Sequence, residues 1–171
     1  MCKFISFFHS PINGDVVVSD LESHGNTETA LKLNNKIWRE GHYLSNGEFE
    51  LRLTADDRVD VIEYNAAFKN RFPTFLSFLN WALDKICVDG KYSDSLDLNG
   101  LTSAKDLVLP KTIGGSLGLN GLTSAKDLVL PKTIGGSLYL NGLTSAKDLV
   151  LPKTIGGSLD LNGLTSAKDL V

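Results

Sequence analysis

Three histidines lie in the first 42 residues of the chain, near three acidic residues. The histidines are His9, His24 and His42, and the acids are Asp20, Glu22 and Glu40. Imidazole and carboxylate groups can bind a metal ion or act as general acid and base. No histidine pair has the spacing of a helical metal motif, and each histidine stands beside a turn or a glycine. We therefore expect surface histidines, no metal, no cofactor and no enzyme activity, with a small enzyme or metal-dependent module as the alternative.

The densest group of recognition-type residues in this half is Trp38, Arg39 and Tyr43. Tryptophan, arginine and tyrosine are the residues that most often anchor protein interfaces. The simpler interpretation is that Trp38 and Tyr43 pack in a small core while Arg39 is solvated. Binding through these three residues is the alternative.

Composition and charge exclude several classes of function. The chain has 171 residues, of which 42% are hydrophobic and 22% charged, as in folded soluble proteins. Its net charge of −3 and the lack of a dense basic stripe argue against nucleic-acid binding. The apolar start MCKFISFF is too short for a membrane span. Two cysteines, Cys2 and Cys87, are too few for a disulfide framework, so we predict a cytoplasmic protein.

The second half consists of tandem repeats. The 20-residue string LNGLTSAKDLVLPKTIGGSL occupies residues 98–117, 119–138 and 140–159, and a fourth copy begins at Leu161. The one position that varies between copies holds Asp97, Gly118, Tyr139 and Asp160. The unit is therefore 21 residues long. A constant frame with one changing position predicts an adjustable binding face, and the alternative is a solvated position where substitutions are harmless.

Each unit contains two short alternating stretches, which predict two strands. In Ser-Leu-x-Leu, as at residues 116–119, both leucines share one face and the variable residue lies on the other. Residues 106–109, closed by Pro110, predict the second strand. The Gly-Gly and Asn-Gly pairs, such as Gly114-Gly115 and Asn120-Gly121, are expected to supply positive φ angles at the corners.

One unit cannot bury its own leucines, but stacked units can. At the roughly 4.8 Å spacing of paired strands, stacking places leucine on leucine and glycine on glycine. We predict an all-β leucine-rich β-solenoid, right-handed and parallel, over residues 91–171, with about four coils of which the last is incomplete. The alternative is a chain of antiparallel hairpins, which Asn-Gly often signals. The Leu-Thr-Ser-Ala that follows Asn-Gly lacks strand alternation and favours the solenoid.

The string Pro-Lys-Thr-Ile-Gly-Gly-Ser-Leu-x-Leu-x-Gly-Leu-Thr-Ser resembles the repeat of receptor L-domains, relatives of leucine-rich repeats. It is more similar still to arrays in repeat proteins of gut bacteria and their phages. The resemblance covers residues 94–171, although this unit is one residue shorter after the Leu-x-Leu strand. It implies a parallel solenoid and a binding role, with no catalytic chemistry. The similarity to phage arrays implies, as one concrete form, an inhibitor of a host bacterial protein.

Residues 1–90 predict a small α+β domain. The expected strands pair as hairpins over residues 3–8 with 15–19 and 42–44 with 48–54. The expected helices are a short one after the N-cap Asn26, one over residues 59–72 and one over residues 73–86. Since the last helix has a broad apolar face and leads into the first coil, we expect it to cap the solenoid.

Val171 falls halfway through a repeat, with no polar closing element. Two alternatives remain: the native chain continues, or the uncapped C-terminal coil associates with another chain. Our leading hypothesis is a non-enzymatic module that binds a protein partner along the solenoid sheet. The others are an enzymatic N-terminal domain with the repeats as its targeting arm, and a structural array that assembles end to end.

Overall fold

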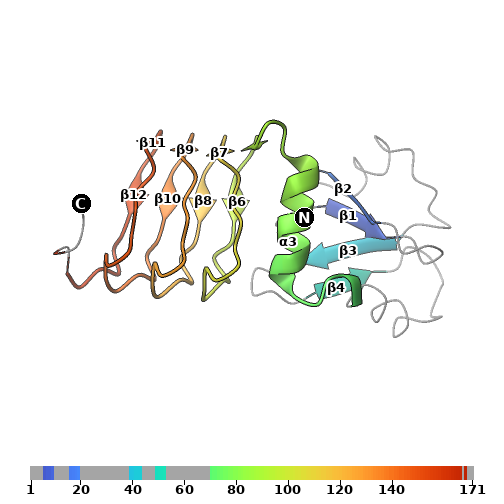
Figure 1. The fold of residues 1–171 in the computed structure, drawn as a ribbon, viewed down its shortest axis with the longest axis horizontal. Coiled ribbons are helices and arrows are strands. Elements are labelled where there is room, and N and C mark those ends of the chain that lie inside the picture. Colours follow the sequence, from blue (N-terminus) through green and yellow to red (C-terminus); the bar gives the residue numbers. More distant parts are fainter. Residues whose placement is uncertain are drawn as a thin grey trace. The chain divides into compact units, whose positions relative to one another are not determined.

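The computed structural model describes residues 6–9, 16–19, 39–43, 49–52, 70–166 and 168. The chain forms two compact units, Met1–Ile86 and Cys87–Val171. Figure 1 shows the strands and the helix of the described residues. Each unit has its own backbone pairing, and the two are described in turn.

The first unit contains a four-stranded antiparallel sheet in the order β2-β1-β3-β4. Its strands are β1 (Ser6–His9), β2 (Val16–Ser19), β3 (Arg39–Tyr43) and β4 (Phe49–Arg52). β1 pairs with β2 and β3 with β4, both antiparallel, as predicted; the connecting turns lie outside the described residues. β3 begins before the predicted residue 42, so that Arg39 also pairs, opposite His9 of β1.

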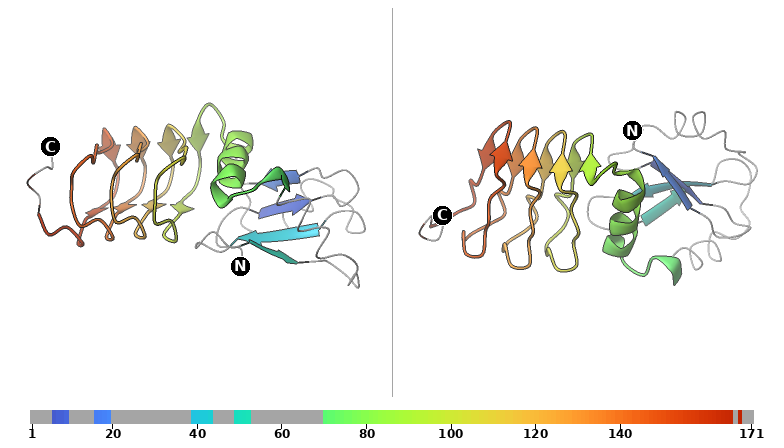
Figure 2. Two further views of the ribbon diagram at one scale, coloured as in Figure 1. Left: turned by 60° about the horizontal axis from the view of Figure 1, so that its bottom comes forward. Right: turned by 45° about the horizontal axis from the view of Figure 1, so that its top comes forward.

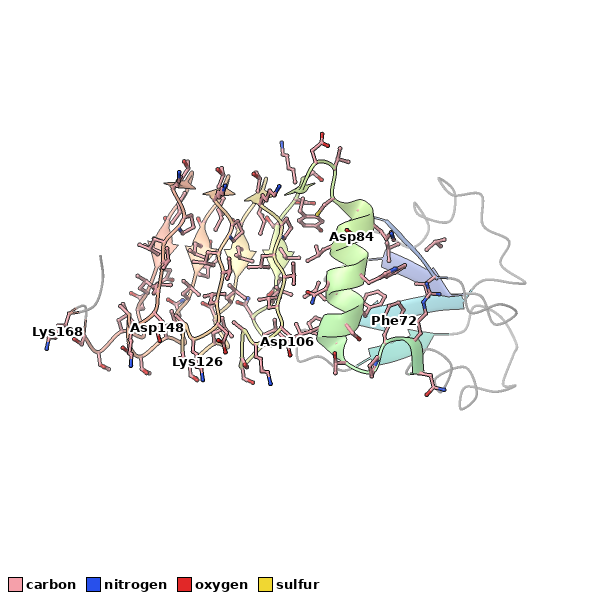
Figure 3. All side chains as sticks on the ribbon, viewed as in Figure 1. Phe72, Asp84, Asp106, Lys126, Asp148 and Lys168 are labelled. Carbon is pink, nitrogen blue, oxygen red and sulfur yellow. The ribbon has the colours of Figure 1, made fainter. Side chains whose placement is uncertain are left out.

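Helix α3 (Phe75–Ile86) confirms the last predicted helix, two residues shorter at its start. Thr74 is the N-cap: its Oγ1 accepts a hydrogen bond from the Ser77 N–H at 3.1 Å, and Ser77 Oγ accepts one from the Thr74 N–H at 3.2 Å. This reciprocal pair works as a capping box and fixes the first turn. α3 packs against β2, and its buried residues are Phe75, Phe78, Leu79, Ala82 and Leu83. Phe72 closes one end of this cluster, with its ring centroid 5.2 Å from that of Phe78 (Figure 3).

The other two predicted helices, after Asn26 and over residues 59–72, lie wholly or mostly outside the described residues. Much of the predicted α+β domain falls there as well, so its fold class stays a prediction. The capping role of residues 73–86 also stays a prediction.

The second unit begins with a tight turn. Val88 and Lys91 form an antiparallel bridge, with N–H to carbonyl distances of 3.1 and 2.9 Å. Between them, Asp89 and Gly90 both have positive φ angles, 52° and 74°. An Asp-Gly pair with two positive φ angles is the preferred two-residue turn between antiparallel segments.

The repeats form a parallel β-solenoid of about three coils of roughly 21 residues. One sheet, in the order β12-β10-β8-β6, contains β6 (Leu96–Asp97), β8 (Leu117–Gly118), β10 (Leu138–Tyr139) and β12 (Leu159–Asp160). The other, in the order β11-β9-β7-β5, contains β5 (Lys91–Tyr92), β7 (Thr112–Ile113), β9 (Thr133–Ile134) and β11 (Thr154–Ile155). Figures 1 and 2 show the coils stacked in chain order. The antiparallel-hairpin alternative is therefore wrong, because every pair between repeat strands is parallel and in register.

The core of the solenoid consists of stacked leucines and isoleucines. In the coil around β8, Ile113, Leu117, Leu119 and Leu122 are all fully buried. Between the full copies the register places like residues side by side, Leu117 next to Leu138 and Ile113 next to Ile134. Full burial of one such side chain stabilises the fold by about 1.5–3 kcal/mol. A single coil has no second layer, and only stacking supplies this burial.

The second predicted strand is wrong in position. Residues 106–109 form no strand, and the second sheet is built three residues further on, from Thr112 and Ile113. The alternation at residues 106–109 instead describes burial: Leu107 is buried, whereas Val108 is 63% exposed. Pro110 ends this stretch, and its ring nitrogen carries no hydrogen for a sheet bond.

The corner glycines also differ from expectation. Among the described residues, positive φ angles occur at Gly90 and at four aspartates: Asp89, Asp106, Asp127 and Asp148. The last three occupy the same place in successive coils, and Asp106 and Asp148 are seen at one corner in Figure 3. There the Leu128 N–H donates to the Ala125 carbonyl at 3.1 Å, which closes a turn around Asp127. Aspartate tolerates the left-handed region better than most residues.

Gly114, Gly115 and Gly121 are required for a different reason, the close approach of neighbouring coils. A Cβ added to Gly114 would collide with the Ser93 carbonyl oxygen, and one added to Gly121 would collide with backbone oxygens of Asn99 and Leu101. Backbone atoms of the preceding coil therefore occupy the space of a side chain. A glycine that permits close backbone contact needs no positive φ.

Serine side chains join the coils at another corner. Ser95 Oγ accepts a hydrogen bond from the Ser116 N–H at 2.9 Å, and Ser116 Oγ accepts one from the Ser137 N–H at 2.9 Å. Ser137 continues the series to the Ser158 N–H at 3.0 Å. We call these residues the serine ladder: Ser95, Ser116, Ser137 and Ser158. The ladder satisfies a backbone donor in each coil with a side chain from the coil before.

Candidate functional site

The four variable residues form one row on the outward side of the β6–β12 sheet. The register pairs Asp97 with Gly118, Gly118 with Tyr139, and Tyr139 with Asp160. The leucines on either side of each variable residue point inward, because side chains alternate along a strand. The sequence-predicted residues of the array are therefore brought together. We call them the variable row: Asp97, Gly118, Tyr139 and Asp160.

Exposure differs along the variable row. Asp97 is exposed, Tyr139 is 36% exposed and Asp160 is half-buried. Gly118 is buried although it carries no side chain. Its cover is the side chain of Asn99 in the preceding coil, because an added Cβ would lie 2.8 Å from Asn99 Oδ1 and 2.9 Å from Nδ2. The row is thus a surface with Tyr139 as its one large side chain.

The two aspartates of the row support the backbone of their own coils. Asp97 Oδ1 accepts a hydrogen bond from the Asn99 N–H at 3.0 Å. Asp160 Oδ1 accepts one from the Asn162 N–H at 3.3 Å. A carboxylate that bonds the backbone two residues on is a common turn-stabilising device. At Asp97 and Asp160, part of the side chain's role is therefore structural.

Beside the variable row runs a second row of side chains, which sequence reasoning missed. Asn99 Oδ1 accepts the Asn120 N–H at 2.9 Å, and Asn120 Oδ1 accepts the Asn141 N–H at 2.9 Å. Asn141 Oδ1 accepts the Asn162 N–H at 3.1 Å. We call these residues the asparagine ladder: Asn99, Asn120, Asn141 and Asn162. Their only signal in the sequence is an asparagine after the Leu-x-Leu of every copy, which was interpreted as a turn residue.

The amide nitrogen of a ladder asparagine can reach the variable row. Asn141 Nδ2 donates a hydrogen bond to Asp160 Oδ2 at 2.9 Å. This bond joins the asparagine of one coil to the variable residue of the next. The candidate site is therefore a pair of adjacent rows, one constant and one variable.

The predicted binding residues of the first unit are only partly placed. Arg39 and Tyr43 are the first and last residues of β3. Trp38 lies outside the described residues, and so does His24. His9 is the last residue of β1, and His42 pairs with Glu50 of β4.

Neither a metal-binding cluster nor a membrane-spanning helix is found among the described residues. Within those ranges, no group of three or more histidine, cysteine, aspartate or glutamate residues is arranged to hold a metal ion. The described helices include none that is long and apolar enough to cross a membrane. Comparisons of the chain with protein-family models, with curated proteins and with solved structures found no match.

Proposed function

We propose that this chain is a non-enzymatic interaction protein that binds a protein partner on the outward side of its β6–β12 sheet. The observation that carries the proposal is the coincidence of sequence and structure in the variable row. Every position that differs between full copies of the repeat lies in that row, and the register aligns all four residues on one side of one sheet.

The physical properties of the face support binding. Backbone pairing and the two ladders hold its residues on a rigid frame, which reduces the conformational entropy lost when a partner binds. Tyr139 offers a partly exposed aromatic ring near the middle of the row. Tyrosine supplies a large contact area with few rotatable bonds, which is why it recurs among the residues that dominate binding energy.

The finer features of the proposal follow the sequence resemblance. The solenoid would be a right-handed relative of leucine-rich repeats, attached to a small α+β domain whose last helix caps it. The protein would act in the cytoplasm, and its partner would be a bacterial host protein inhibited by a phage or mobile-element product. The repeat string Ile-Gly-Gly-Ser-Leu-x-Leu supports the first of these features.

The test is an affinity comparison on the full chain. Partners are captured from a lysate of the source organism and identified, and their affinity is then measured by calorimetry with the wild type and with Tyr139→Ala. We expect Tyr139→Ala to weaken binding about 10-fold to 100-fold, the loss of about 1.4–2.7 kcal/mol typical of an interface anchor.

The matched control is Lys126→Ala, an exposed residue on another side of the coil. This variant should bind as the wild type does. Asp97→Ala tests the edge of the row and should have a smaller effect than Tyr139→Ala. If every captured partner binds Tyr139→Ala and the wild type equally, the β6–β12 sheet is not the binding face.

A further inference from the structure

We propose that the side-chain amides of Asn99 and Asn120 are additional binding groups, and that they donate hydrogen bonds to neutral carbonyl oxygens of the partner. This inference rests on the proposed function, since it concerns the same face. It adds two constant residues to the variable row and names the chemistry that they recognise.

The ladder fixes the direction of each amide. The Oδ1 atoms of Asn99 and Asn120 are held at 2.9 Å by N–H groups of the next coil. With the oxygen held, the planar amide leaves Nδ2 on the side of the variable row. Asn141 shows the result, because its Nδ2 reaches Asp160 Oδ2 at 2.9 Å. Asn99 and Asn120 have their Oδ1 atoms held in the same way, so their Nδ2 donors lie beside the variable residue of the following coil, Gly118 and Tyr139.

Two of these donors meet no acceptor in the variable row. In the coil after Asn99 the variable residue is Gly118, which has no side chain, although Asn99 Nδ2 lies 2.9 Å from the site of its missing Cβ. In the coil after Asn120 the variable residue is Tyr139, and no hydrogen bond joins its hydroxyl group to Asn120 among the described residues. Among the described residues, neither Nδ2 atom makes a hydrogen bond like that of Asn141. Asn99 and Asn120 are half-buried.

An amide donor without a protein acceptor favours a ligand that supplies one. When a partner covers the face and excludes water, an unmatched amide loses its hydrogen bonds and weakens binding by roughly 1–3 kcal/mol. A partner with an oxygen at each position avoids that loss. The two positions belong to neighbouring coils and are separated by roughly 4.8 Å, within the span of two residues of an extended chain.

The charge of the row selects a neutral oxygen. Asp97 lies one coil before Gly118, and Asp160 lies one coil after Tyr139. A carboxylate of the partner placed between them would be repelled from both sides. Main-chain carbonyls and the amides of asparagine and glutamine offer an oxygen without that charge. The geometry therefore points to a polypeptide segment that lies over Tyr139 and presents two neutral carbonyls.

The experiment uses nuclear magnetic resonance on the full chain, with N-methylacetamide as a neutral carbonyl probe. The side-chain NH₂ signals of Asn99, Asn120 and Asn141 are followed during titration with the probe. We expect the first two to shift progressively and the third to shift much less, since Asp160 already holds its donor. Acetate, titrated as the anionic control, should shift Asn99 and Asn120 less than N-methylacetamide does.

Two variants reverse which of these amides has an acceptor within the protein. Asp160→Gly removes the acceptor of Asn141, so the Asn141 signal should become sensitive to the probe. Gly118→Asp supplies an acceptor to Asn99, so the Asn99 signal should become insensitive. A backbone amide spectrum of each variant that matches the wild type outside the altered coil shows that the fold is retained.

Equal shifts of all three asparagines, or no shift of any, would overturn the inference. So would a Gly118→Asp variant in which Asn99 still responds to the probe. These results are independent of partner capture. Silent amides together with weaker partner binding by Tyr139→Ala would remove this inference and leave the proposed function standing. Responsive amides with unchanged partner binding would show that the donors are available, but would remove the β6–β12 sheet as the partner's binding face and this inference with it.

Discussion

At the residue scale, the glycines of the repeat fall into two classes, which differ in the atoms that face them. Gly135 faces backbone: a Cβ there would collide with the Gly114 carbonyl oxygen. Gly118 faces a side chain, that of Asn99, and the same position holds tyrosine or aspartate in other coils. A backbone obstacle cannot move without disturbing the stack, whereas an asparagine side chain can shift slightly and keep its hydrogen bond, as Asn120 does beside Tyr139.

Replacing these glycines by alanine should separate the two classes. We expect Gly135→Ala to lower the free energy of unfolding by about 2 kcal/mol or more, because the added methyl forces two coils apart. Gly118→Ala should change it by about 0.5 kcal/mol. Urea denaturation of both variants measures the difference, and equal losses would show that close backbone approach is not what requires glycine.

The corner aspartates show where residue-level reasoning failed. Asp106 and Asp127 adopt φ angles of 65° and 63°, although each is followed by leucine and the predicted positive-φ positions were glycines. The string Lys-Asp-Leu does not indicate that its aspartate has a positive φ angle, because aspartate is also common at helix caps and in turns of other types. The turn around Asp127 is closed by Ala125 and Leu128, and both are buried only because the coils stack.

At the element scale, the coils are joined by side chains as well as by sheets. Ser116 Oγ accepts the Ser137 N–H across the coil boundary, whereas Ser124 Oγ accepts the N–H of Lys126 in its own turn, at 3.2 Å. Both serines are hydroxyl acceptors of a backbone donor. They differ in whether the bond links two coils.

Ser116→Ala should therefore destabilise the array more than Ser124→Ala does. Loss of the bond leaves a partly buried N–H without an acceptor, and we expect a decrease of about 1 kcal/mol in the free energy of unfolding. Hydrogen exchange at the Ser137 amide should also become faster. Ser124→Ala is the matched control, and unchanged protection of the Ser137 amide in Ser116→Ala would contradict the ladder.

The strands could be predicted only where the residues with alternating burial are also the residues that pair in a sheet. Ser-Leu-x-Leu shows its period of two because its leucines are buried, and the same residues pair. Residues 106–109 alternate too, but Pro110 follows them and the pairing falls on Thr112 and Ile113. Alternation reports which side of the chain is buried. It does not indicate which backbone N–H and C=O groups form hydrogen bonds with a neighbouring strand.

The candidate site was likewise only partly predictable from the sequence. The variable row follows directly from comparing the copies, because a shared position in every repeat becomes a shared position in every coil. The asparagine ladder does not, since its bonds join residues 21 positions apart. Their existence depends on the stacking distance, and no single unit contains both donor and acceptor.

At the scale of the whole molecule, the array is a sum of equivalent parts. Each coil contacts its neighbours through the same pairs, so removing one complete unit rejoins two surfaces that already match. The free energy of unfolding should then fall by the contribution of one coil, while the remaining coils keep their fold. The length of the array would be adjustable on this basis.

Deletion of residues 119–139 tests this additivity. We expect a folded protein with a β-type circular dichroism spectrum, a lower free energy of unfolding and a smaller denaturant dependence, because less surface is exposed on unfolding. Deletion of residues 119–128 is the control, since it breaks the 21-residue period and should abolish the stack. A complete loss of structure in the full-unit deletion would contradict additivity.

The hydrogen bonds at a separation of 21 residues have a consequence for how the chain finds its fold. A coil that pairs with the copy next to it closes a loop of one unit, and a coil that skips a copy closes a loop twice as long. Doubling a loop costs only about 0.6 kcal/mol in closure entropy. Because the constant parts of the copies are identical, a coil that forms during folding can pair with several nearly equivalent copies. The entropy of loop closure favours the adjacent copy only weakly. Between residues 96 and 166, the variable positions Asp97, Gly118, Tyr139 and Asp160 are then the only ones at which one coil differs from another.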